Sequence, residues 1–162
     1  SALLLFCFTI SFATISCAQK ITEKNLPAAV KTAFSTKFPG ASNVKWGKEN
    51  AKEYEAEFKL NNSDVSANFL ATGEWVETET ALSATDLPTS ITNAIKSKYP
   101  GASINKGEKL EKPAGKILYE VFIKTNGKTK EVELNPDGSF VKTLEFTRKL
   151  GDDAVTQSIG HA

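Results

Sequence analysis

Two stretches of the chain place apolar residues at helical spacing. In the first, the apolar stripe runs at intervals of three and four residues through Leu26, Val30, Ala33, Phe34 and Phe38. A proline fits the first turn of such a helix, and a Pro-Gly pair ends it, because the residue before a proline avoids the α region. The second stretch repeats the stripe and both prolines, and Asp86 is a candidate N-terminal cap. The pattern predicts helices over 26–38 and 87–99.

The two helical stretches are copies of one sequence. LPAAVKTAFSTKFPGAS begins at Leu26, and LPTSITNAIKSKYPGAS begins at Leu87, an offset of 61 residues (87 − 26). Eight of the 17 positions are identical, and most other changes keep the apolar pattern. Self-similarity at a fixed offset predicts a repeated supersecondary unit.

After each helix the hydrophobic period changes from 3.6 to 2. Residues 53–60 place Tyr54, Ala56, Phe58 and Leu60 on one side and Glu53, Glu55, Glu57 and Lys59 on the other. This alternation predicts a strand with one face on a core and one in water. Its counterpart, 116–124, carries Leu118 and Phe122 where the first copy has charges, which predicts burial on both faces.

Turn sequences separate further strands in each copy. Asn61-Asn62 and Asn126-Gly127 are turn dipeptides, and the run 135–138, Asn-Pro-Asp-Gly, is a strong hairpin turn. A weaker strand is expected between each helix and its strong strand. We therefore expect an α+β fold: two tandem repeats of one helix followed by three to four antiparallel strands, the first over 22–80 and the second over 87–146. Residues 147–162 are expected to be an irregular tail or one short helix.

The first 18 residues carry no charge and differ from the rest of the chain. Their short apolar run and the small residues Ser16 and Ala18 resemble a secretory signal peptide with its cleavage site. Two alternatives stay open, a lipoprotein signal lipidated at Cys17 and an uncleaved anchor. Each reading places the protein in the periplasm or cell envelope, or outside the cell, with no membrane span in the mature chain unless the anchor is kept.

Composition and motifs exclude several classes of function. The sequence contains 20 Lys and Arg and 19 Asp and Glu, so it lacks the excess of basic residues expected of a nucleic-acid-binding protein. The single histidine, His161, is next to the last residue, and no nucleophile, phosphate-loop or metal-ligand motif occurs. We predict neither enzymatic activity nor a cofactor. The alternating Glu53, Glu55 and Glu57 fit a solvated strand face, with a Ca²⁺ site as the alternative.

Three aromatic residues are candidates for a protein-binding site. Trp46 and Trp75 lie on predicted strands beside charged residues, and Phe140 occupies the position of Trp75 in the second copy. On an open sheet face these rings would anchor a protein partner. Facing the helices, they would belong to the core, which is the reading that their recurrence in both copies favours for Trp75 and Phe140.

The repeated helix L-P-x-x-[VI]-x-x-A-[FI]-x-x-K-[FY]-P-G-A, the Tyr-x-[AV]-x-[FI]-Lys strand and the closing Gly hairpin resemble the PepSY-like, or β-lactamase-inhibitor-like, proteins exported by Gram-negative bacteria. The resemblance covers about residues 22–145. It implies helices on one side of a curved antiparallel sheet, similar to the β-lactamase inhibitor protein, which grips its enzyme with a concave sheet surface. No inhibitory residue of that protein has a counterpart that the sequence identifies.

These observations lead to two expectations for function. The first is an exported, non-enzymatic binding protein that holds an unknown protein or peptide on its open sheet face, with inhibition of a hydrolase as one form of this role. The alternative is an envelope protein that binds a small ligand or an ion, either in the groove between helix and sheet or at the Glu-rich strand.

Overall fold

The computed structural model describes residues 20–148 and 155–160. The signal-like segment 1–18 with Cys17, and His161, lie outside the described residues. In chain order the elements are η1 (Glu23–Asn25), α1 (Ala28–Lys37), β1 (Ser42–Lys48), β2 (Glu53–Leu60), β3 (Ser63–Leu70), β4 (Trp75–Leu82), α2 (Thr89–Lys98), β5 (Ser103–Lys112), η2 (Pro113–Gly115), β6 (Lys116–Thr125), β7 (Lys128–Leu134), β8 (Phe140–Arg148) and β9 (Val155–Gly160).

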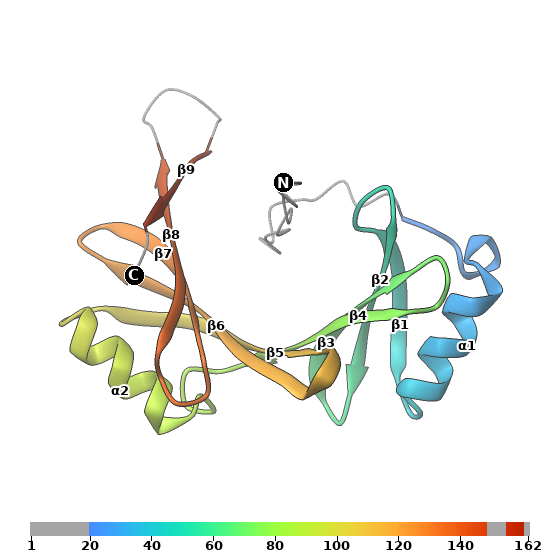
Figure 1. Cartoon of the computed structure of the whole chain (residues 1–162), viewed down its shortest axis with the longest axis horizontal. Coiled ribbons are helices and arrows are strands. Elements are labelled where there is room, and N and C mark those ends of the chain that lie inside the picture. The colour runs from blue at the N-terminus through green and yellow to red at the C-terminus, as the bar shows by residue number, and fades with distance from the viewer. Residues whose placement is uncertain (1–19, 149–154, 161–162) are drawn as a thin grey trace, which may run out of the picture.

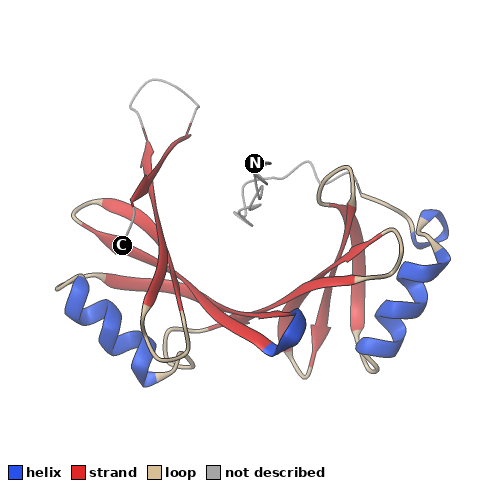
Figure 2. Ribbon diagram, in the orientation of Figure 1, coloured by secondary structure: helices blue, strands red, loops and turns tan. Residues whose placement is uncertain are grey.

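The strands form one antiparallel sheet whose order, β1 to β9, follows the chain. The sheet is strongly curved, and both helices lie on its convex side, one towards each end (Figure 1). Figure 2 shows the same arrangement by element type, with no helix drawn on the concave side of the described sheet. The predicted α+β class, an antiparallel sheet with two helices, is confirmed.

Each helix buries its apolar stripe against its own group of strands. Val30 and Phe34 of α1 pack on a cluster that includes Ala56, Ala67 and Phe69 of β2 and β3. The second cluster joins α2 to β6 and β7 and contains Leu87, Ile91, Ile95, Val121, Ile123, Val132 and Leu134. Because side chains alternate along a strand, the residues between these core positions point to the concave face.

The junction between the two groups is the pairing of β4 with β5. Thr78 pairs with Glu111, and Leu82 pairs with Gly107 at the other end of the ladder. This ladder makes the sheet continuous, so residues from both groups of strands share one concave face.

A tight turn contacts each helix in the same way. A Cβ added at Gly73, after β3, would lie 2.7 Å from the backbone oxygen of Ala29, and one at Gly138, after β7, 2.8 Å from that of Ser90. Both glycines have positive φ, 86° and 89°. The corresponding residues are separated by 65 (138 − 73) and 61 (90 − 29) positions, close to the offset of the repeated sequence.

The structure corrects three details of the sequence reading. The tail expected to be irregular or helical instead contributes strand β9, which pairs with β8. Helix α1 begins at Ala28, so Pro27 precedes the first turn. Asp86 is not a helix cap: Pro88 occupies that position in α2, while the Asp86 carboxylate accepts a hydrogen bond from Ser83. The expected burial of β6 on both faces is confirmed, since Leu118 is 1% and Phe122 3% exposed.

Candidate binding surface on the concave face

Carboxylates from five strands line the concave face. The register places Glu55 of β2 beside Asn68 of β3, and Asn68 beside Glu77 of β4. Further along, Glu108 of β5 pairs with Glu120 of β6, which pairs with Glu133 of β7. We call the following residues the acidic row: Glu55, Glu57, Glu77, Glu79, Glu108, Glu120, Glu131 and Glu133.

Three members of the row, Glu55, Glu79 and Glu120, have a raised pKa. Burial is the largest cause of each shift, followed by neighbouring carboxylates. The pKa of Glu55 rises to about 7, with Glu49 and Glu57 as the main neighbours. That of Glu79 rises to about 8, chiefly beside Glu108, and the nearby Lys112 offsets a small part of the rise. That of Glu120 rises to about 9, chiefly beside Glu131 and Glu108.

Apolar side chains on the same face explain the burial of Glu79 and Glu120. Leu110 of β5 pairs with Leu118 of β6 and with Glu79 of β4. Leu118 and Phe122 stand two positions on either side of Glu120 along β6, so all three point to the concave face. A carboxylate packed beside such groups loses hydration, which disfavours its charged form. Glu120 is 6% exposed.

Lysines neutralise Glu108 and Glu77 of the row. Lys106 Nζ lies 2.9 Å from Glu108 Oε1, and Lys112 Nζ pairs with Glu77. Among the described residues, no ion pair includes Glu55, Glu79 or Glu120. We refer to these as the three uncompensated glutamates. Glu79 accepts one long hydrogen bond, 3.5 Å, from Ser66 Oγ.

Asn68 adds an unsatisfied acceptor to this face. The residue is 7% exposed, and within the described part of the chain no donor makes a hydrogen bond to its side-chain oxygen Oδ1. A buried amide oxygen without a donor costs about 1–3 kcal/mol. The position pairs with both Glu55 and Glu77, so a donor reaching Asn68 Oδ1 would also approach two carboxylates.

The row could hold protons or accept hydrogen bonds, but its geometry is not that of a metal centre. Within 20–148 and 155–160, no group of three His, Cys, Asp or Glu side chains is placed to hold a metal ion. The sequence reading of Glu53, Glu55 and Glu57 as a solvated strand face holds for Glu57, which is exposed, whereas the other two are half-buried. One signal in the sequence could have shown that this face is partly desolvated: Leu118 and Phe122 stand where the first repeated segment has glutamates.

The three aromatic candidates lie on the helix side of the sheet. Trp46 is 9% exposed and meets the Phe34 ring edge-on at a centroid distance of 5.0 Å. Trp75 is half-buried against the same cluster, and its indole N–H donates to Thr78 Oγ1 at 2.9 Å. Phe140 packs against the second cluster, with its ring centroid 6.0 Å from that of Tyr99. A protein-binding role for these residues stays a prediction, and the acidic row contains none of them.

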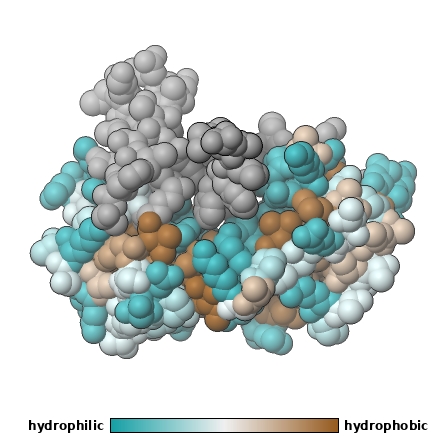
Figure 3. Space-filling view, viewed as in Figure 1, coloured by the Kyte–Doolittle hydropathy of each residue, from teal (hydrophilic) through white to brown (hydrophobic). Residues whose placement is uncertain are grey.

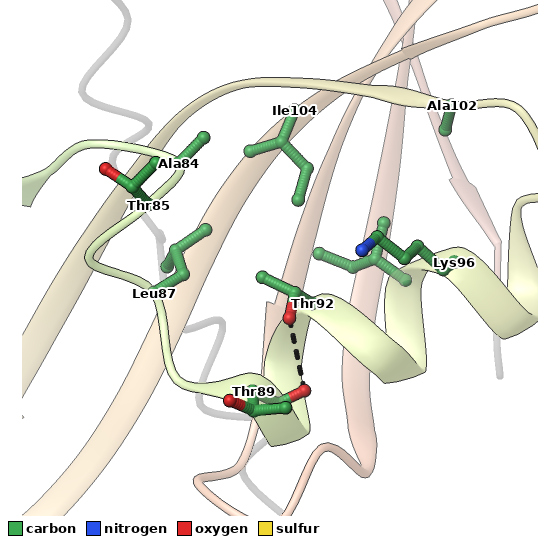
Figure 4. Close-up of a pocket in the computed structure, with 9 residues that line it drawn as sticks. Ala84, Thr85, Leu87, Thr89, Thr92, Lys96, Ala102 and Ile104 are labelled. Atoms are coloured by element: carbon green, nitrogen blue, oxygen red, sulfur yellow. Dashed lines mark hydrogen bonds between the residues drawn. The ribbon is translucent and has the colours of Figure 1, made fainter.

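A pocket of about 420 Å³ lies between α2, the segment before it and the start of β5. The hydroxyl-bearing side chains of Thr85, Thr89 and Thr92, the apolar Leu87 and Ile104, and Lys96 line it (Figure 4). This is the helix–sheet groove that the sequence reading gave as an alternative ligand site. Apart from Lys96, its lining has no charged group.

The described surface in the view of Figure 3 is mostly hydrophilic, with apolar areas that are small and separate. No helix in the described part of the chain is both long and apolar enough to cross a membrane.

Comparison with solved structures identifies the fold. A DUF2874 family protein from Bacteroides ovatus ATCC 8483 is 24% identical, with a TM-score of 0.69 over 74% of this chain and 87% of the other. A BLIP-like protein from Bacteroides fragilis NCTC 9343 is also 24% identical, with a TM-score of 0.67 over 78% of this chain and 89% of the other. A protein from Bacteroides eggerthii DSM 20697 described as a "putative periplasmic" protein is 18% identical, with a TM-score of 0.68 over 74% and 88%. At these identities the likeness shows the fold alone.

Sequence comparison identifies the family. No protein of curated function matches the chain. One family model matches it twice, over residues 13–66 and 52–142, which together span most of its length. The chain therefore belongs to the family described as "Putative beta-lactamase-inhibitor-like, PepSY-like".

Proposed function

We propose that this chain is an exported, non-catalytic binding protein that holds a protein or peptide on the concave face of its sheet. The observation that carries the proposal is the acidic row, a polar and partly desolvated surface drawn from β2 to β7. Buried carboxylates that repel one another cost folding free energy, and such a cost is commonly kept where a surface serves a function. The helices cover the convex side of the sheet, which leaves the concave face as the proposed binding surface.

Duplication explains how such a face is built. We infer that the two groups of strands are copies of one unit, supported by the repeated helix sequence, the double match to one family model and the equivalent Gly73 and Gly138 contacts. Glu55 and Glu120 are separated by 65 positions (120 − 55) and occupy corresponding places on β2 and β6. Joining the copies through β4 and β5 lets the acidic row extend over adjacent strands from β2 to β7, which supports binding of a polypeptide.

Export to the periplasm or cell envelope is the second part of the proposal. The uncharged segment 1–18 has the composition of a signal peptide, with lipidation at Cys17 as the alternative outcome. The similar protein from Bacteroides eggerthii is described as periplasmic. Mass spectrometry of the mature N-terminus distinguishes cleavage near Ala18 from a lipid on Cys17.

Site-specific photocrosslinking in living cells tests which face binds. One variant carries a photoreactive amino acid at Glu57, exposed on the concave face, and its matched control carries the same group at Thr32, exposed on α1. We expect a discrete crosslinked protein or peptide with the Glu57 probe and none with the Thr32 probe. Equal crosslinking at both positions, or crosslinking from Thr32 alone, contradicts the proposal. Because the family description refers to inhibitors, any hydrolase recovered in this way would next be assayed for inhibition.

A small ligand in the pocket beneath α2 is the alternative function. The pocket volume of about 420 Å³ and the three threonines around Lys96 favour a small anionic molecule there. A thermal-shift screen of metabolites separates the alternatives: a hit that is lost in Lys96→Ala and kept in Glu57→Gln supports the pocket.

A further inference from the structure

The uncompensated glutamates indicate what kind of group would stabilise the concave face. Glu55, Glu79 and Glu120 have no ion-pair partner among the described residues and stand beside other carboxylates. Cations brought to this face would gain attraction from several carboxylates at once. Partial burial makes that attraction stronger than on an open surface, because screening by water is reduced.

Asn68 provides an independent indication. Its buried Oδ1 receives no hydrogen bond from any described residue, and Asn68 lies in register between Glu55 and Glu77. An ammonium or guanidinium group supplies several N–H donors, so one such group could serve this oxygen and a neighbouring carboxylate together. An apolar or anionic occupant would leave Asn68 Oδ1 unsatisfied.

The extent of the surface favours a polypeptide over a single ion. The acidic row crosses from β2 to β7, whereas a bound Ca²⁺ needs six to eight oxygens around one point. Leu110, Leu118 and Phe122 lie among the carboxylates and suit the aliphatic stems of lysine and arginine side chains. Lys106 already shows this mode, with its Nζ 4.4 Å from the Phe122 ring centroid and 2.9 Å from Glu108.

We propose, on the basis of the binding function proposed above, that the partner is a polypeptide segment presenting lysine or arginine side chains, which pair with the three uncompensated glutamates and donate to Asn68 Oδ1.

Capture of such a segment is coupled to proton release. The groups facing Glu120 are Glu108, Glu79, Glu131 and Glu133, and those facing Glu55 are Glu49, Glu57 and Glu77. Glu79 faces Glu77, Glu55, Glu108 and the cation Lys112. With pKa values of about 8 and 9, Glu79 and Glu120 are mostly protonated at pH 7, and Glu55, at about 7, is half protonated. Pairing with a cation therefore displaces protons to the solvent. Binding at pH 7 is therefore expected to release protons and to strengthen as the pH rises towards 9.

The test is titration calorimetry of the full mature protein with two synthetic peptides. One alternates lysine and valine, and the other alternates glutamate and valine at the same length. The binding variant is Glu55→Gln/Glu79→Gln, and the control variant is Glu23→Gln/Glu74→Gln, which replaces two glutamates at exposed positions outside the row. Asn68→Leu tests the unsatisfied oxygen. Circular dichroism establishes that each variant is folded before titration.

We expect the lysine peptide to bind the wild-type protein and the control variant alike, and the binding variant about tenfold or more weakly. Asn68→Leu should weaken binding severalfold, and the observed heat should differ between two buffers of unlike ionisation enthalpy. The inference is overturned by equal binding of both peptides, by unchanged affinity in the binding variant, or by a thermal shift with CaCl₂ that the lysine peptide does not produce. If crosslinking at Glu57 succeeds and the lysine peptide fails to compete, the binding function stands and the cationic partner does not.

Discussion

Lys37, in the last turn of α1, places its Nζ 3.5 Å from the centroid of the Trp75 ring at the start of β4. The same relationship occurs in the second group of strands, where Lys98 Nζ of α2 lies 4.1 Å from the centroid of Phe140 at the start of β8. Each contact links the C-terminal end of a helix to the first residue of a strand, β4 for α1 and β8 for α2. In both contacts the ammonium group lies over the face of the ring, an attractive cation–π geometry.

The Lys37–Trp75 contact is expected to stabilise the fold modestly. In a double-mutant cycle of Lys37→Gln and Trp75→Leu, we predict a coupling free energy of about 0.5–1 kcal/mol. Urea unfolding followed by circular dichroism measures it. Lys24→Gln, in the exposed η1 turn, is the control for the loss of one positive charge. A coupling indistinguishable from zero would mean that the close approach contributes no net stability.

The two tryptophans should differ in their cost on truncation. Trp46 is buried against Phe34, so Trp46→Ala removes a large ring from the core and should cost about 3–5 kcal/mol. Trp75→Ala removes a half-exposed ring and one hydrogen bond to Thr78, and should cost about 1–2 kcal/mol. Urea unfolding measures both. If both substitutions lowered the free energy of unfolding by the same small amount, Trp46 would again be a candidate for the protein-binding surface.

The stability of the protein should fall as the pH rises through the neutral range. The pKa of Glu120 is 4.5 in its ordinary state and about 9 in the folded protein. Between these values the native chain binds more protons than the unfolded chain, so its free energy of unfolding decreases with rising pH. The contribution is complete below about pH 4.5 and is lost as the pH rises through about 9.

Glu120→Gln removes this titration and should flatten the stability–pH profile. We compare the free energy of unfolding of the variant with that of the wild-type protein at two pH values. The difference, variant minus wild type, should be about 1–3 kcal/mol larger at pH 9 than at pH 5. Chemical unfolding at a series of pH values provides the measurement. Glu74→Gln, an exposed residue outside the acidic row, is the matched control. Parallel profiles for Glu120→Gln and the wild-type protein would exclude Glu120 as a source of the pH dependence.

Gly73 should be far less replaceable than Gly40, although both have positive φ, 86° and 90°. An alanine at Gly40 would contact nothing within 4 Å, so Gly40→Ala carries only the backbone cost of about 1 kcal/mol. An alanine at Gly73 would come within 2.7 Å of the Ala29 backbone oxygen and should cost about 1–3 kcal/mol more. Thermal and urea unfolding compare the two, and equal losses would show that α1 shifts to make room.

Most elements could be predicted because their signals are local. The stripe from Leu26 to Phe38, the alternation from Tyr54 to Leu60 and the repeated Pro-Gly pairs each depend on a few neighbouring residues. Strand β9 was missed because 155–160 has no counterpart in the repeat, and its hydrogen bonds depend on the edge of β8 being available. The start of α1 was placed too early because the proline that begins the pattern lies just outside the helix.

The sequence by itself determined the two helices and the side of β2 that faces a helix, because the hydrophobic period sets both. Only the tertiary structure decided that Glu55, Glu79, Glu108 and Glu120, from four strands, share one concave face beside Leu110 and Leu118. Strand order and register bring these residues together, and burial beside apolar groups then raises the pKa values of three of them. Electrostatic energy depends on distance in space and on local hydration, neither of which is encoded in the spacing of residues along the chain.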